Sequence, residues 1–241
     1  MNVYDSLILK TTAILDKCQL KELKVNPNVS WPLLNTNEFL MGKEVAFELG
    51  DRFKPCVVYN CPTSNNELVN QDKIFLIGKD LNEIKENTNF SRIAFINIDD
   101  IKDPNKAYVK VKKLDYERYR LIPEGYMILS SSFDNKENIR VSKKAIKNGL
   151  NFEILGNLYI NYYKKIEGVN NVIMFFIVGD LNEINDLVKI SKDVNDVTNA
   201  FDHILKDIIA DCEVCPLKKI CEDVEELRKL HFEAIGKPLD K

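Results

Sequence analysis

Three cysteines near the end of the chain are spaced as ligands of a metal centre. Cys212, Cys215 and Cys221 fall within the segment CEVCPLKKIC, in a chain that holds six cysteines. The short first gap lets two thiolates bind one metal, and a turn at Pro216 returns the third thiolate to it. Thiolates are soft ligands that favour iron–sulfur clusters or zinc. The spacing predicts a metal centre with three protein thiolates, one fewer than the usual four.

The first interpretation of this motif is a [4Fe–4S] cluster. Its fourth ligand would be an external thiolate, no ligand at all, or one of the remaining cysteines, which are Cys18, Cys56 and Cys61. An iron without a protein ligand would be open to substrate. Lys218 and Lys219 make the motif polar and would offset the negative charge of a cluster, which favours this interpretation.

Two other interpretations of the cysteines stay open. A structural zinc ion with three cysteines and one histidine would use His203 or His231. His231 lies ten residues after Cys221, on an expected helix that could fold back. The third interpretation is that the thiols bind nothing, because cysteine often serves as a small core residue.

Length and composition describe an ordinary globular chain. It has 241 residues, of which 45% are hydrophobic and 29% are charged, and its formal net charge is −3. This charge argues against a nucleic-acid-binding protein, which would carry a basic surface. No apolar run is long enough to span a membrane, and the N-terminus does not resemble a signal peptide. We therefore expect a cytoplasmic location, where the cysteines would stay reduced.

Short apolar runs predict strands, and longer periodic runs predict helices. The expected strands are 45–49, 56–59, 74–77, 93–98, 126–133 and 172–178. The expected helices are a short one within 1–25 and others at 141–148, 152–166, 182–210 and 222–235. The polar, lysine-rich segment 99–113 is expected to be a solvated turn.

Two segments of the chain are similar to each other. Residues 74–84 read IFLIGKDLNEI, and residues 175–184 read FFIVGDLNEI. A duplicated strand–helix unit would explain this similarity. We favour the simpler explanation that Gly followed by Asp suits the turn from a strand to a helix.

These elements predict an α+β fold with a mixed sheet flanked by helices. Residues 1–37 would form an N-terminal helical extension and loop, and residues 38–209 the main α+β domain. Residues 210–241 would form a helical cysteine module that ends in a helix and packs against the main domain.

Four stretches of the sequence resemble one enzyme family in the same order along the chain. They are VAFELG at 45–50, DKIFLIGKDLNEIKEN at 72–87, PEGYM at 123–127, and the long segment that begins IRVSKKAIKNGLNFEILGNLYINYY at 139. Over residues 38–205 the chain resembles the middle domain of bacterial acetyl-CoA synthase and the β subunit of the archaeal CO dehydrogenase/acetyl-CoA synthase. The resemblance implies a role in anaerobic one-carbon metabolism.

The chain also departs from this family. The family continues into a domain that holds nickel on a Cys-Gly-Cys element, and this chain has no such element. The resemblance therefore implies an accessory role, in electron transfer or protein docking, and not synthase activity. It implies a protein partner such as a corrinoid protein, a ferredoxin or a separate synthase subunit. It also implies that Arg140 and Lys143 contact an anionic group such as a phosphate of coenzyme A.

Overall fold

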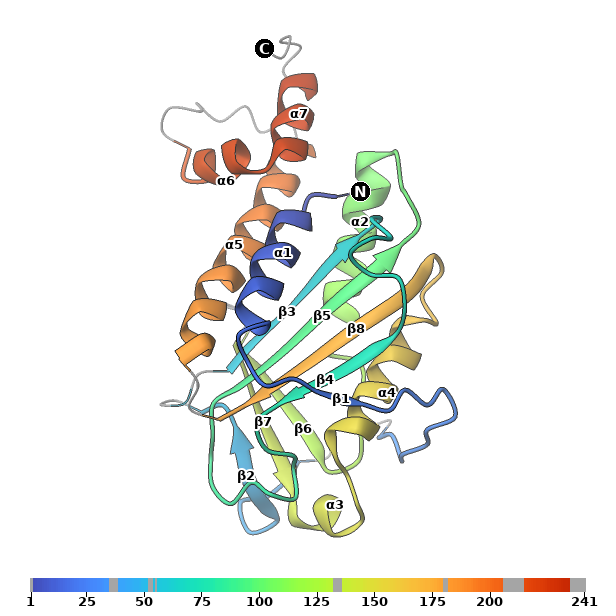
Figure 1. The fold of residues 1–241 in the computed structure, drawn as a ribbon, viewed down its shortest axis with the longest axis vertical. Helices are drawn as coiled ribbons and strands as arrows, with labels where there is room; N and C mark the ends of the chain where they lie inside the picture. The colour runs from blue at the N-terminus through green and yellow to red at the C-terminus, as the bar shows by residue number, and fades with distance from the viewer. Residues whose placement is uncertain are drawn as a thin grey trace.

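A mixed sheet of five strands forms the centre of the structure, and an antiparallel sheet of three strands packs below it in Figure 1. The computed structural model describes residues 2–34, 39–51, 54, 56–131, 136–179, 182–205 and 215–234. The larger sheet contains, in spatial order, β1 (Lys21–Leu23), β4 (Lys73–Ile77), β8 (Val169–Val178), β5 (Phe90–Ile98) and β3 (Cys56–Thr63). The smaller sheet contains β2 (Val45–Leu49), β7 (Lys136–Ser142) and β6 (Tyr126–Ser131).

Helices flank both sheets, and two of the described helices lie near the C-terminus. The helices are α1 (Asp5–Leu15), α2 (Pro104–Glu117), α3 (Lys143–Lys147), α4 (Phe152–Tyr163), α5 (Asn182–Leu205), α6 (Lys218–Asp223) and α7 (Glu225–Ala234). The predicted α+β class, with a mixed sheet flanked by helices and with C-terminal helices, is confirmed. None of the described helices is both long enough and apolar enough to cross a lipid bilayer.

The larger sheet is built around the antiparallel pair β5–β8, in which Ile93 lies opposite Phe175. On its outer side each of these strands pairs with a parallel neighbour, β3 beside β5 and β4 beside β8. Every residue of β3 and β5 is buried. Strands buried on both faces read as continuous apolar runs, which is why the sequence identified most of this sheet.

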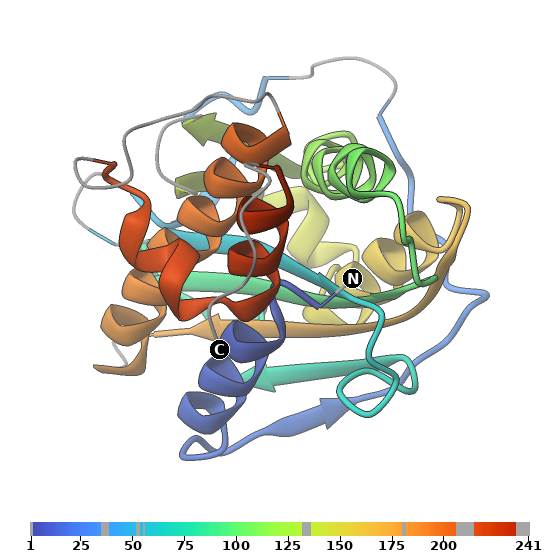
Figure 2. The same ribbon diagram turned by 90° about the horizontal axis from the view of Figure 1, so that it is seen from above.

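Two hydrophobic cores lie on opposite faces of the larger sheet. Successive side chains along a strand point to opposite faces. Cys56 and Val58 of β3 therefore join the core that contains α4, whereas Val57, Tyr59 and Cys61 join the core that contains α1 and α5. Figure 2 shows these helices on the two sides of the sheet.

The N-terminal segment takes part in this architecture. Leu7, Ile8 and Leu15 of α1 are 1% exposed and pack beneath α5 in the second core. Strand β1 extends the sheet by antiparallel pairing with β4. The loop that follows is held by Trp31, whose indole N–H donates to the carbonyl of Glu124 at 3.0 Å. Residues 2–34 thus contribute a helix, an edge strand and an anchored loop.

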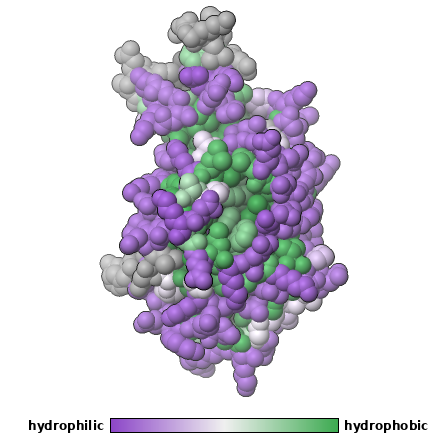
Figure 3. Space-filling model, in the orientation of Figure 1, coloured by the Kyte–Doolittle hydropathy of each residue, from purple (hydrophilic) through white to green (hydrophobic). Residues whose placement is uncertain are grey.

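Part of β4 and β8 stays uncovered beside α1. Phe75 and Ile173 are half-buried there, and the ring of Phe75 stacks on Phe175 with centroids 5.2 Å apart. Figure 3 shows apolar side chains gathered in the middle of this face of the molecule.

The solvated turn predicted for residues 99–113 is wrong, because most of that segment belongs to α2. The side chain of Asp103 caps this helix by accepting hydrogen bonds from the backbone N–H groups of Asn105 and Lys106. Pro104 occupies the first turn, where its missing N–H costs nothing. The buried stripe consists of Ala107, Val111 and Leu114 at helical spacing. The lysines between them conceal this stripe in the sequence.

The helix predicted at 141–148 also differs from the observed elements. Strand β7 continues to Ser142, with Ile139 and Val141 fully buried, and α3 starts only at Lys143. Ser142 caps α3 by accepting the backbone N–H of Ala145 at 2.9 Å.

The two similar segments lie side by side in the structure. They form β4 and β8, which pair in parallel with Leu76 beside Phe176. Beyond the strands they diverge, because Leu81 and Ile84 enter the first core whereas Ile184 enters the second. Residues 81–83 form a turn, whereas the second segment continues as α5. This divergence favours turn chemistry over duplication as the source of the similarity.

We predict that Gly78→Ala strongly destabilises the protein. Gly78 has φ +91°, and a Cβ built there would overlap the backbone carbonyl of Val178 in the neighbouring strand. Strained φ and steric overlap together should lower the free energy of unfolding by about 3 kcal/mol. Gly149→Ala is the matched control, because Gly149 has φ +96° and open space around it, so only about 1 kcal/mol should be lost. Urea unfolding measures both values, and equal losses would contradict the prediction.

Candidate functional site

The C-terminal cysteine module packs on the last part of α5. Helices α6 and α7 both contact α5, with Ile220 and Leu227 buried against it. The backbone carbonyl of Cys215 accepts a hydrogen bond from the backbone N–H of Lys218 at 3.1 Å, and this bond closes the turn that leads into α6. Cys221 lies within α6, and its backbone N–H donates to the carbonyl of Leu217 at 3.1 Å. This turn and short helix place the two cysteines on one compact unit.

Neither of the two cysteines that the structure describes in this module is fully buried. Cys215 and Cys221 are both half-buried, and Cys221 packs against the second core. Cys212, the remaining member of the motif, lies outside the described residues. Among the residues that the structure describes, no three His, Cys, Asp or Glu side chains come together as a metal site. The predicted three-thiolate centre stays a prediction.

The other three cysteines lie in different parts of the molecule. Cys56 points into the core on the α4 face of the sheet, whereas the module packs on the opposite face. Cys61 is fully buried beneath α1. Cys18 follows α1 and lies near Glu183, at the start of α5. Because α5 has 24 residues and is about 36 Å long, Cys18 lies near the end opposite to the module.

The electrostatic surroundings of two of these cysteines favour the neutral thiol. Burial raises the pKa of the Cys61 thiol well above its usual range, and the nearby Asp5 carboxylate raises it further. Burial and Glu183 also raise the pKa of Cys18. Since the thiolate is the form that binds metals, both cysteines suit packing better than ligation.

One histidine of the zinc interpretation has an unusual environment. His203 lies in the last turn of α5, and its Nδ1 is buried without a hydrogen-bond partner in the described part of the chain. An unsatisfied buried nitrogen costs about 1–3 kcal/mol, so such an atom calls for a partner. His231 lies on α7 against the ring of Phe232, with centroids 6.2 Å apart.

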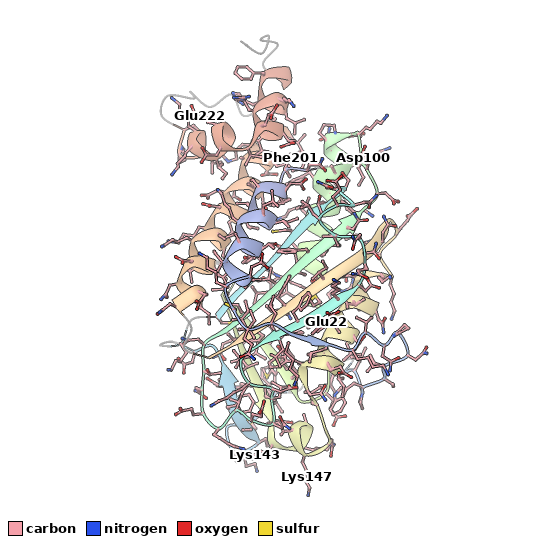
Figure 4. All side chains as sticks on the ribbon, in the orientation of Figure 1. Glu22, Asp100, Lys143, Lys147, Phe201 and Glu222 are labelled. Atoms are coloured by element: carbon pink, nitrogen blue, oxygen red, sulfur yellow. The ribbon has the colours of Figure 1, made fainter. Side chains whose placement is uncertain are left out.

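Arg140 and Lys143 lie far from the cysteine module. The Arg140 guanidinium donates to Glu48 at 2.8 Å and also to the carbonyl of Leu40. The Lys143 ammonium donates to the carbonyl of Lys43 at 3.0 Å. In Figure 4, Lys143 and Glu222, the neighbour of Cys221, lie at opposite ends of the molecule. One small ligand therefore cannot touch both places.

A polar groove that the sequence did not predict opens along the free edge of β3. It encloses about 710 Å³ between α2 and α5, and Tyr59, Asn60 and Pro62 of β3 form its floor. The groove was missed because its walls are more than seventy residues apart in sequence, and one wall is the helix misread as a turn. Lys112 and Tyr116 are one helical turn apart, which is a local signal that they lie on one face of this wall.

Buried polar groups fix the floor of this groove. Arg118, 2% exposed, donates to the carbonyl of Val58 at 3.1 Å and pairs with Asp115 at 3.2 Å. Asn60 donates to the carbonyl of Leu114 at 3.1 Å and accepts the Tyr163 hydroxyl at 3.3 Å. These bonds join β3 to the C-terminal end of α2 and to α4, so the base of the groove is preformed.

Comparisons with known proteins add no family assignment. A scan against models of protein families and a search of curated proteins both returned no match to this chain.

We predict that the cysteines differ sharply in reactivity towards iodoacetamide. Cys215 and Cys221 are half-buried and should be alkylated in the native, metal-free protein. Cys56 and Cys61 should react only after unfolding, because both are at most 4% exposed and burial raises the pKa of Cys61. Peptide mass spectrometry of native and urea-treated samples measures each site. Labelling of native Cys61 as fast as that of Cys215 would contradict the described packing.

Proposed function

We propose that this chain is an iron–sulfur protein whose C-terminal module holds a [4Fe–4S] cluster through Cys212, Cys215 and Cys221. The observation that carries the proposal is the cysteine spacing, together with the half-buried positions of Cys215 and Cys221 on one turn and short helix. Thiolate sulfur is the donor that such clusters require. By contrast, Cys56 and Cys61 are buried in the two cores of the sheet.

The surroundings of the module suit a cluster near the surface. Lys218 and Lys219 begin α6, and the Lys218 ammonium lies 4.0 Å from Glu222, with both side chains well exposed. Exposed cations beside the cluster would offset its negative charge and offer a contact surface to a partner. The placement of Cys18 and Cys56 away from the module favours a fourth ligand from outside the chain, or an open iron position.

We further propose an accessory role in anaerobic CO and acetyl-CoA metabolism, either electron transfer or docking. This role rests on the resemblance of residues 38–205 to the acetyl-CoA synthase middle domain, and on the missing Cys-Gly-Cys element. The partner would be a ferredoxin, a corrinoid protein or a separate synthase subunit. An open iron position that binds substrate would instead make the chain an enzyme in its own right.

The buried Nδ1 of His203 favours a second candidate function. A zinc ion bound by the three module cysteines and His203 would satisfy this nitrogen and would tie α5 to the module. The chain would then be a zinc-stapled interaction protein without a redox role.

Metal analysis of anaerobically purified protein tests the proposal. We expect a brown protein with iron and acid-labile sulfide in equal amounts, whose visible absorption bleaches on reduction. Cys212→Ser, Cys215→Ser and Cys221→Ser should each lose most of the iron, whereas the matched control Cys18→Ser should keep it. Reduction without any substrate turnover supports the accessory role.

If the protein instead contains one zinc per chain and no sulfide, and His203→Ala loses this zinc, the iron–sulfur proposal is wrong and the zinc module is correct. Absence of any bound metal after reconstitution with iron and sulfide would overturn both.

A further inference from the structure

The groove between α2 and α5 has the composition of a ligand site and plays no part in the cysteine chemistry. Its cavity of about 710 Å³ is within the range of about 300–1,000 Å³ typical of small-molecule sites. We propose that this groove binds a nucleoside phosphate, with the base against Tyr116 and the phosphate between Lys112 and Lys192. Helix α2 contacts α5, and Figure 2 shows one end of α5 close to α2.

The two helices present matching polar faces to the groove. On α2, Lys112 and Tyr116 are four residues apart and therefore lie on one face, followed by Tyr119 just beyond the helix. On α5, the lining residues recur at helical spacing as Lys192, Asn195, Asp196 and Asn199. Polar groups thus line both walls, together with Val111 on α2 and Val194 on α5.

Positive charge predominates in the groove. Lys112, Lys192 and Arg118 line it, against the carboxylates of Asp115 and Asp196. Asp115 already pairs with Arg118 at 3.2 Å. Burial and the neighbouring Asp193 raise the pKa of Asp196, whereas the nearby Lys192 ammonium lowers it, so this carboxylate and Lys192 lie close together. Lys112 and Lys192 lie on the two facing helices, and a phosphate accepts strong charge-assisted hydrogen bonds from such groups.

An exposed aromatic ring supplies the second recognition element. Tyr116 is 63% exposed, which is unusual for a side chain of this size, and lies one turn from Lys112. Tyr119 is held under the Arg118 guanidinium, with Cζ 4.7 Å from the ring centroid, so the wall beside Tyr116 is rigid. A planar base gains binding free energy by stacking on a tyrosine ring. The amides of Asn195 and Asn199 can donate to and accept from base edges or sugar hydroxyls.

The buried base of the groove makes the site preorganised. Arg118 and Asn60 are held by hydrogen bonds to β3 and α2, and Tyr4 donates to or accepts from Thr198 at 2.8 Å on the α5 side. A ligand would therefore meet a groove whose base is already fixed by the fold and would not need to be ordered on binding.

Isothermal titration of the full chain with AMP tests the proposal, with adenosine and inorganic phosphate as separate probes. We expect saturable AMP binding that is at least about tenfold tighter than binding of either probe, because each probe lacks one recognition element. Lys112→Ala, Lys192→Ala and Tyr116→Ala should each weaken AMP binding by about five- to tenfold.

Matched controls come from the same helices. Lys113→Ala on α2 and Lys189→Ala on α5 remove exposed lysines that do not line the groove, and they should bind AMP as the parent chain does. All five positions are exposed, so folding is expected to survive, and circular dichroism verifies it.

Three outcomes would overturn the proposal. They are no saturable AMP binding, equal binding by all variants, and binding of phosphate or adenosine alone as tightly as AMP. The titration is repeated on Cys215→Ser, which removes the proposed cluster ligand. AMP binding by that variant would show that the groove acts whether or not the metal proposal is correct.

Discussion

Burial of both faces of β5, and of most of β8, is the constraint on which the rest of the structure depends. The two strands pair along their whole length, from Phe90 opposite Val178 to Ile98 opposite Val169. Their side chains alternate between two cores, so a helical layer is needed on each side. α4 supplies one layer, and α1 with α5 supplies the other. The long α5 reaches beyond the sheet and carries the cysteine module, so the module's position follows from the same requirement.

Local features of the chain could be predicted from the sequence because they depend on neighbouring residues alone. Continuous apolar runs identified β3, β5 and β8, since strands buried on both faces show no alternation that could be misread. α2 was missed because three apolar residues, spread among lysines, are enough to dock it on the edge of β3. Its cap of Asp103 followed by Pro104 was the signal that could have revealed it.

The candidate sites also differ in whether the local sequence is enough to predict them. The spacing of Cys212, Cys215 and Cys221 is a local pattern, and it predicts a metal centre without knowledge of the fold. Whether a distant cysteine can join the metal centre depends on the face of the sheet to which its side chain points. Cys56 and Cys61 are five residues apart on one strand, an odd separation that places them on opposite faces. The groove depends entirely on how α2 and α5 dock against each other, which neither segment shows by itself.

The outer edge of β3 is blocked, and this affects how the protein behaves at high concentration. An open strand edge is a template on which a second molecule can add its own strand. Here the Val58 carbonyl is taken by Arg118, Pro62 has no N–H to offer, and α2 lies across the strand. The eight buried residues of β3 can therefore form the edge strand of the sheet without offering a free edge for self-association into fibrils.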